Sequence, residues 1–253
     1  MLEFVQTADG SKTIYNPHVG ENYHSKNGAL QESTHVFINS GLSYFLEAKE
    51  SLCEENTTIP LAKVDLEGPE STSVSILEVG FGTGLNFLLS SEFCTKKNIK
   101  LDYTGIEAYL LNLEMISQTG YDQYVSTELW QQFINNYNEL LLSATELNAY
   151  CKLQIANCKL LDFNAKEQYD IIYFDAFAAG HQPEMWNETA ISHTIQFLKP
   201  GGVFVTYAIT GNLKRSLKAL GCKIEKAPGA AGKREMLRAV KLGSPKEGRS
   251  ESQ

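Results

Sequence analysis

The N-terminal part of the chain combines an extended pattern with a helical one. Apolar and polar residues alternate over residues 2–15 on either side of the turn sequence Ala8-Asp9-Gly10-Ser11, which predicts a β-hairpin. From 32 to 55, apolar residues recur at helical spacing and predict an amphipathic helix, although Gly41 falls in its middle. The polar segment 64–73, which contains Pro and Gly, is expected to be a connector.

From residue 74 onward, apolar runs are followed by helical stretches. This alternation is typical of a doubly wound, mostly parallel β-sheet with helices on both faces. The expected strands are 74–79, 101–107, 153–156, 170–175 and 202–208, followed by an antiparallel pair at 222–226 and 236–241. The Leu-, Asn- and Gln-rich stretch 109–150 predicts two or three helices. The sequence therefore predicts an α/β fold with a Rossmann-like sheet.

The expected organisation is one α/β core with additions at both ends. Residues 1–63 form an N-terminal hairpin and helix extension, and 74–242 form the core, with 109–150 as a helical insertion. The polar sequence GSPKEGRSESQ at 243–253 predicts a disordered tail.

Charge is distributed unevenly along the chain. The net charge of −8 argues against a protein that coats nucleic acid through bulk electrostatics. Residues 212–241, however, contain nine basic and two acidic residues, a net charge of +7, so the remainder carries −15. Such a distribution fits docking of one phosphate-rich ligand at a defined face, or solvated helix and strand surfaces with no ligand.

Neither a membrane protein nor a metal enzyme is predicted. No segment approaches the ~20 apolar residues that span a bilayer, and the N-terminal residues resemble no export signal, so a soluble, cytoplasmic protein is expected. The five cysteines contain no C-x-x-C pair and are expected to be reduced thiols, mostly buried. The five scattered histidines form no metal-binding motif.

The most informative segment is the glycine loop at 75–88, SILEVGFGTGLNFL, in which an apolar strand leads through glycines into a helix. A dinucleotide fingerprint starting at Gly80 would need glycine at 85, where the chain has Leu85, and no G-K-[ST] of a P-loop follows. The arrangement E-x-G-x-G-x-G is typical of class I S-adenosylmethionine-dependent methyltransferases. The alternative is a glycine-rich turn that binds no ligand.

Polar residues at the ends of three later strands are candidate ligand contacts. Glu107 ends the second strand, where a carboxylate would accept hydrogen bonds from ribose hydroxyls, unless it is an ordinary surface glutamate. Asn157 and Cys158 follow the third strand, where an adenine-reading side chain would lie. Asp175 ends the fourth strand and could orient or deprotonate an acceptor, or alternatively cap the next helix or bind the cofactor.

Several longer motifs resemble the methyltransferase half of the MnmC-type tRNA-modifying enzymes and their stand-alone relatives. They are LEVGFGTGLNFL (77–88), FDAFAAGHQPEMW (174–186), FLKPGGVFVTYA (197–208), GKREML (232–237) and the upstream stretch 22–37. The resemblance extends from about residue 20 to 240. It implies a class I fold with S-adenosyl-L-methionine over Gly80–Gly84 and its ribose near Glu107. It also implies methylation of the exocyclic amine of 5-aminomethyl-2-thiouridine at the tRNA wobble position, giving 5-methylaminomethyl-2-thiouridine.

The resemblance and the loop together assign candidate roles to individual residues. Cofactor contacts are predicted from Tyr23, Glu78, Gly80, Phe81, Gly82, Thr83, Gly84, Asn86, Glu107, Asn157, Cys158 and Asp175. Asp175 is also the candidate catalytic residue. Phe177, Lys233 and Arg234 are the candidate contacts to the anticodon region of tRNA, and Trp186 is more simply explained as a core residue.

Two departures from the family pattern affect the interpretation. Bifunctional members carry a second, FAD-dependent domain that generates the amine, and 253 residues leave no room for it, so a separate FAD-dependent or other enzyme would supply the amine. Asn157 stands where an aspartate is expected to read adenine. Two other functions stay open, namely a methyltransferase or aminopropyltransferase that acts on a small molecule, and a non-catalytic module that binds cofactor or RNA.

Overall fold

The structure is a computed structural model that describes residues 2–55, 72–165 and 168–243. Apart from their terminal residues, the expected connector 64–73 and the expected tail 243–253 lie outside these ranges. Within the described residues, no helix combines the length and the apolar character that crossing a bilayer requires.

An eight-stranded sheet forms the centre of the molecule, in the order β10-β11-β9-β8-β4-β5-β7-β6. Its parallel strands are β4 (Ser73–Val79), β5 (Lys100–Ile106), β7 (Cys151–Ala156), β8 (Tyr169–Phe174) and β9 (Leu198–Thr206). The antiparallel strands are β6 (Thr145–Asn148), β10 (Cys222–Pro228) and β11 (Glu235–Lys241). All seven predicted strands are confirmed. β10 and β11 form the predicted C-terminal antiparallel pair, and β11 also pairs with β9.

Alternating side chains along the strands form two separate cores. On β4, Ile76 belongs to the core cluster on one face of the sheet and its neighbour Leu77 to the cluster on the other face. Because both faces of the central strands are buried, β8 and β9 contain apolar runs, whereas β7 alternates buried and exposed residues. The covering helices are α3 (Leu85–Lys96), α4 (Leu113–Ser117) and α5 (Thr127–Leu140), and on the opposite face α6 (Glu188–Ile195) and α7 (Gly211–Ala219).

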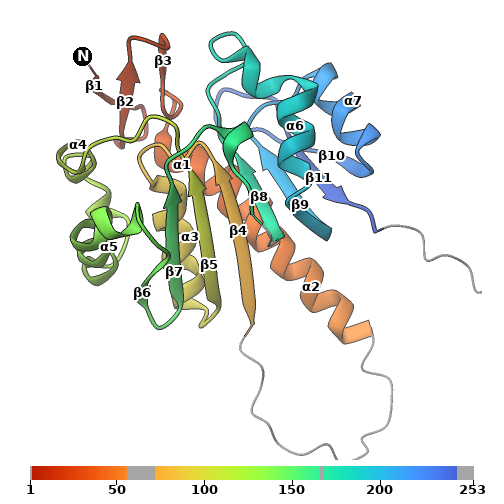
Figure 1. Ribbon diagram of the computed structural model, residues 1–253, viewed down its shortest axis with the longest axis horizontal. Coiled ribbons are helices and arrows are strands. Elements are labelled where there is room, and N and C mark those ends of the chain that lie inside the picture. The colour runs from red at the N-terminus through yellow and green to blue at the C-terminus, as the bar shows by residue number, and fades with distance from the viewer. Residues whose placement is uncertain (1, 56–71, 166–167, 244–253) are drawn as a thin grey trace, which may run out of the picture.

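The N-terminal extension consists of a small sheet and a helical run. The strands are β1 (Glu3–Gln6), β2 (Lys12–Asn16) and β3 (Glu21–Asn22), and the helical elements are α1 (Ala29–Ser33), the π-helical η1 (Thr34–Ser43) and α2 (Tyr44–Glu55). Figure 1 shows the small sheet at the end of the molecule where the parallel strands terminate. The predicted hairpin and helix are confirmed, and a third strand is added.

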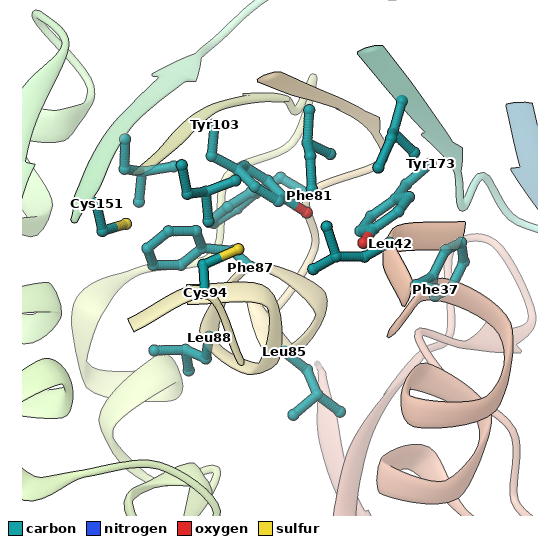
Figure 2. Packing of buried hydrophobic residues seen from close by; sticks show 14 of the residues in the cluster. Phe37, Leu42, Phe81, Leu85, Phe87, Leu88, Cys94, Tyr103, Cys151 and Tyr173 are labelled. Carbon is teal, nitrogen blue, oxygen red and sulfur yellow. The ribbon is translucent and has the colours of Figure 1, made fainter. Parts of the chain in front are cut away.

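Gly41 allows the helical run to pack closely on the sheet. A Cβ atom at this position would lie 3.0 Å from the side chains of both Tyr173 and Val205. The glycine that interrupts the sequence pattern is therefore a close-packing position, and the helix continues through it. Figure 2 shows the same layer, with Phe37 and Leu42 of η1 packed beside Tyr173, and with Phe87 of α3 beneath Tyr103.

The prediction for 109–150 was only partly right. The segment contains α4, the 3₁₀ turn η2 (Tyr121–Gln123) and α5, as expected, but it ends in β6, which pairs antiparallel with β7 at the edge of the sheet. Only Leu147 of β6 is buried. A four-residue edge strand with one buried side chain has too little hydrophobic alternation to be recognised in a sequence.

Candidate functional site

The glycine loop connects β4 to α3 and brings the backbone close to two neighbouring segments. Gly80 and Gly82 have φ values of 90° and 53°, in the left-handed region that favours glycine. A Cβ atom at Gly80 would lie 2.6 Å from the carbonyl oxygen of Asp175, and one at Gly82 would lie 2.9 Å from the ring of Tyr23. A larger residue at either position would therefore push away the Asp175 backbone or the Tyr23 ring that the loop contacts.

The helix after the loop begins without a side-chain cap. Gly84 is the N-cap residue of α3 and supplies no side-chain hydrogen bond to the first turn. The N–H groups and the positive end of the helix dipole are therefore available to a carboxylate or phosphate. This arrangement is what the sequence predicted for a ligand at the end of β4.

A cavity of about 470 Å³ opens at the carboxyl ends of β4, β5, β7 and β8. Since β4 lies between β5 and β8, the cavity lies where the strand order reverses, which is the usual ligand position in open α/β sheets. Its volume suits a small-molecule ligand. Eight of the residues predicted from the sequence line it, namely Tyr23, Gly80, Phe81, Gly82, Glu107, Cys158, Asp175 and Phe177.

Glu107 connects the end of β5 to the glycine loop. Its Oε2 accepts a hydrogen bond from the Gly82 N–H at 2.9 Å, and its Oε1 accepts one from the Tyr109 N–H at 2.9 Å. Burial raises the pKa of the Glu107 carboxyl, while these N–H donors favour its ionised form. Asn157 lies behind it and donates from Nδ2 to the Glu107 carbonyl at 2.9 Å, so it holds the strand end and does not line the cavity.

Four of the predicted cofactor contacts support the loop and are not part of the cavity wall. Thr83 is buried against the Tyr121 hydroxyl, and Gly84 forms the start of α3. Asn86 donates from Nδ2 to Glu78 Oε1 at 2.7 Å and to Asp175 Oδ2 at 2.8 Å. The Tyr103 hydroxyl also donates to Glu78, at 2.8 Å. A chain of polar contacts thus runs from the core to the carboxyl of Asp175.

Asp175 lies at the junction of two cavities. It lines the large cavity and also a second one of about 200 Å³, whose wall includes Glu32 and Lys233. Burial, together with the nearby carboxylates of Glu32 and Glu21, raises the pKa of Asp175 to about 8, although Asn86 and Lys233 act in the opposite direction. The carboxyl can therefore take up or release a proton near neutral pH.

The second cavity contains a lysine that the sequence assigned to tRNA. The Nζ of Lys233 lies 2.6 Å from Glu32 Oε1 and 3.9 Å from the centre of the Tyr207 ring. Lys233 therefore points into the molecule. Arg234, next to it, is exposed and lines neither cavity. Trp186, in the 3₁₀ turn η4 (Pro183–Trp186), is buried and donates from Nε1 to the Phe177 carbonyl at 2.7 Å, as expected for a core residue.

Most of the other basic residues of 212–241 have partners inside the molecule. Arg238 forms an ion pair with Glu225 at 2.9 Å, and Lys226 forms one with Glu235 at 3.4 Å. Lys241 donates to two backbone carbonyls. Glu225 and Glu235 are the two acidic residues already counted in the local charge of +7, so these pairs fix several basic side chains in place without removing that net charge.

Several residues of the two cavities could not be recognised from local motifs. The larger cavity also includes Tyr109 and Asp162, the latter from the 3₁₀ turn η3 (Leu160–Asp162). Among the described residues, no group of three or more His, Cys, Asp or Glu side chains is placed to hold a metal ion. Glu21, Glu32 and His24 come from the N-terminal extension and meet the core only in three dimensions.

Comparisons with known proteins agree with this architecture. A family described as S-adenosyl-L-methionine-dependent methyltransferase matches residues 123–242, in agreement with the cofactor predicted from the glycine loop. The tRNA 5-methylaminomethyl-2-thiouridine biosynthesis bifunctional protein MnmC of Leptospira interrogans is 28% identical over 224 residues, 85% of this chain and 32% of that protein. The MnmC of Magnetococcus marinus is 25% identical over 250 residues, 93% of this chain and 34% of that protein.

The chain spans about a third of the length of the curated relatives it matches. Among solved structures, MnmC2 from Aquifex aeolicus matches with a TM-score of 0.71 and 22% identity, covering 97% of this chain and 72% of that chain. This likeness shows the shared fold, a mostly parallel α/β sheet with helices on both faces. The resemblance predicted from the sequence motifs is therefore confirmed.

Proposed function

We propose that this homologue of the methyltransferase part of the MnmC proteins transfers the methyl group of S-adenosyl-L-methionine to an amine on tRNA. The acceptor would be 5-aminomethyl-2-thiouridine at the wobble position, and the product 5-methylaminomethyl-2-thiouridine. The observation that carries the proposal is the position of Asp175, which lies between a cavity of cofactor size and a smaller acidic one. This position supports a role for Asp175 as a proton acceptor between the two reactants.

The residues around the larger cavity fit S-adenosyl-L-methionine. The uncapped start of α3 is suited to the carboxylate of its methionine part, and Glu107 is suited to the ribose hydroxyls. Tyr109 and Asp162 also line the cavity and are candidate contacts to the base of the cofactor. When bound, the cofactor supplies a methyl group that its sulfonium activates for transfer.

Asp175 would prepare the acceptor by removing a proton. A primary ammonium has no lone pair for attack, so it must lose a proton before methylation. The pKa of Asp175 is about 8, so the carboxyl is ionised in part near neutral pH; in this ionised form it can accept the proton, which then leaves to solvent. Asn86 keeps the carboxyl in place through its bond to Oδ2. Positioning the amine in a cavity with little water would contribute much of the rate enhancement over the uncatalysed reaction.

Aromatic side chains would hold the acceptor base. Phe177 lines both cavities, and its ring contacts that of Tyr23 edge-on at a centroid distance of 5.1 Å. Chemistry on an anticodon base requires that the base leave its stack, and an aromatic face compensates for the lost stacking. Arg234, exposed beside the second cavity, is the candidate contact to the tRNA backbone.

The reaction also needs a source of the aminomethyl intermediate. We propose that a separate FAD-dependent or other activity supplies it, and that the reaction takes place in the cytoplasm, where tRNA is modified. The structure favours neither a small-molecule acceptor nor a non-catalytic role over this function.

The test is methyl transfer from labelled S-adenosyl-L-methionine to total tRNA from a strain that lacks the gene, followed by nucleoside analysis. We expect label in 5-methylaminomethyl-2-thiouridine. Asp175→Asn is expected to bind the cofactor but to transfer methyl groups ~10²-fold more slowly. If no tRNA is labelled although the cofactor binds, the tRNA assignment is wrong and a small molecule becomes the better acceptor.

A further inference from the structure

The ion pair between Lys233 and Glu32 joins segments that are far apart in the sequence. Lys233 lies between β10 and β11, and Glu32 lies in α1 of the N-terminal extension. Glu32 is almost fully buried, and its Oε2 accepts a hydrogen bond from the Ser25 N–H at 2.9 Å. Its other oxygen faces the second cavity and holds the lysine Nζ at 2.6 Å. One carboxylate oxygen is thus fixed, and the other binds an ammonium.

The surroundings of this ammonium form a binding site for a cation. Three carboxylates line the cavity, those of Glu21, Glu32 and Asp175, and Tyr207 presents its ring face to the lysine Nζ. A carboxylate together with an aromatic face in a partly enclosed space is the arrangement that recognises ammonium groups.

An unpartnered polar atom points to a further ligand contact. His24 lines both cavities and is 7% exposed, and its Nδ1 has no hydrogen-bond partner among the described residues. Burial lowers the pKa of His24 to about 4, so its ring is neutral and can bond to a polar group of a ligand. A buried polar atom left without a partner is costly, and a bound ligand would satisfy it.

We propose that Glu32 and Tyr207 form the subsite for the primary ammonium of the acceptor, and that Lys233 occupies this subsite as an internal substitute until the acceptor displaces it. This inference rests on the proposed function, because the acceptor there is a primary amine. Since Asp175 belongs to the same cavity, an ammonium held by Glu32 lies beside the group that removes its proton.

This assignment and a phosphate contact by Lys233 predict opposite results. If Lys233 competes with the acceptor, its removal frees the subsite and lowers the KM for tRNA. If Lys233 binds a tRNA phosphate, its removal raises the KM and weakens the dependence of binding on salt. The sign of the change in KM therefore separates the two roles.

The first experiment tests the subsite without any methyl transfer. Lys233→Ala removes the side-chain carbons beyond Cβ together with Nζ, a gap that n-propylammonium matches in length and charge. We expect n-propylammonium chloride to raise the Tm of this variant in a saturable way at millimolar concentrations. Neither 1-propanol nor sodium chloride at equal ionic strength should do so. The double variant Lys233→Ala/Glu32→Gln should lose the response, and a Lys233→Ala variant that shows no saturable response would overturn the subsite.

The second experiment tests its use by the acceptor. In steady-state methylation, Lys233→Met should lower the KM for tRNA about five-fold, the factor expected for removing a modest competing ion pair. Glu32→Gln should raise this KM, and the Kd for S-adenosyl-L-methionine should stay the same in both. Lys226→Met removes a surface lysine from its pair with Glu235 and is the matched control, with no change expected.

The two experiments fail in different ways. If n-propylammonium binds but no tRNA is methylated, the ammonium subsite stands and the proposed function is wrong. If tRNA is methylated and Lys233→Met raises the KM for tRNA, the function stands and the internal-substitute role of Lys233 is wrong. Lys233→Met also keeps most of the side-chain volume, so it provides a test if Lys233→Ala does not fold.

Discussion

At the scale of single residues, the carboxyl of Asp175 has an unusual environment for an aspartate. It receives a hydrogen bond from Asn86, yet it lies in the field of Glu32 and Glu21 and has lost much of its hydration. Desolvation and like charges both favour the protonated form, and they outweigh the single amide donor and the ammonium of Lys233. The same environment that permits proton transfer therefore has a cost in stability.

This cost can be measured through the pH dependence of unfolding. The pKa of Asp175 is about 8 in the folded protein against an ordinary value of 3.8, so the folded state binds one proton more than the unfolded state between these pH values. The contribution of Asp175 to stability is therefore complete below pH 4 and is lost as the pH rises toward 8. Asp175→Asn should remove this slope, so that its stability relative to wild type grows with pH by a few kcal/mol at most.

Urea unfolding of wild type and Asp175→Asn at pH 5, 6, 7 and 8 would measure the difference. Asp122→Asn, at an exposed position of η2, is the matched control, and its free energy of unfolding should depend on pH as that of wild type does. If the free energy of unfolding of Asp175→Asn also has the pH dependence of wild type, the pKa of the Asp175 carboxyl is not raised in the folded protein.

Glu107 offers a second prediction at this scale. In the proposed complex it accepts hydrogen bonds from ribose hydroxyls, and Glu107→Gln replaces a charged acceptor by a neutral one. The affinity for S-adenosyl-L-methionine should fall about ten- to hundred-fold, the usual loss for one charge-assisted bond. Isothermal titration calorimetry would measure it, with the exposed Glu114→Gln in α4 as control. Equal affinity in Glu107→Gln and wild type would remove Glu107 from the cofactor site.

At the scale of elements, the helical run of the N-terminal extension is fixed to the sheet by close packing. Gly41 brings η1 against β8 and β9, and Phe37 contacts the ring of Tyr173 at a centroid distance of 5.0 Å. The same run carries Glu32 in α1, two residues before η1 begins at Thr34. The position of Glu32 in the second cavity therefore depends on how η1 lies on the sheet.

Gly41→Val tests this packing. The added carbon atoms would meet two side chains already 3.0 Å from the position of Cβ, so we expect a loss of about 1–3 kcal/mol in the free energy of unfolding. A gain in helix propensity offsets only part of it. Gly180→Val, in a loop where a Cβ would have nothing within 4 Å, is the control. Equal stability of Gly41→Val and wild type would mean that the helix can move off the sheet.

Sequence patterns predicted the sheet because its central strands, such as β8 and β9, contain apolar runs and β7 alternates clearly, and each ends at a turn or a loop. They predicted the glycine loop because Gly80, Gly82 and Gly84 are adjacent in the sequence. The second cavity was not predicted, since Glu32 and Lys233 are 201 residues apart and neither belongs to a local motif. Strand β6 was missed because it buries only Leu147.

At the scale of the whole molecule, positive charge is exposed in only part of the C-terminal segment. Arg215 and Lys218 are exposed on α7, whose buried side carries Leu213 and Leu217. Because α7 follows β9, it begins at the end of the sheet where the cavities open, and Figure 1 shows it beside β10. We propose this exposed face of α7 as a further candidate contact, in addition to Arg234, with the backbone of the tRNA acceptor.

Arg215→Glu/Lys218→Glu should therefore weaken tRNA binding and leave the affinity for the cofactor unchanged. The slope of the logarithm of the binding constant against the logarithm of the salt concentration should fall by the amount expected for the loss of about two phosphate contacts. Filter binding at several salt concentrations would measure both. Lys97→Glu/Lys100→Glu changes charge equally, but at the amino ends of the strands, away from the cavities, and is the control. If both double variants lose affinity equally, net charge rather than α7 governs binding.

The groups suited to the methyl donor and those suited to the acceptor lie in different parts of the chain. The groups suited to S-adenosyl-L-methionine lie mainly on the central sheet, whereas Glu21, His24 and Glu32, which line the second cavity, come from the first forty residues. Substitutions in these forty residues could therefore change which molecule is methylated and leave the methyl donor as it is. The same methyltransferase core would then act on different acceptors, and the N-terminal extension would determine which acceptor is bound.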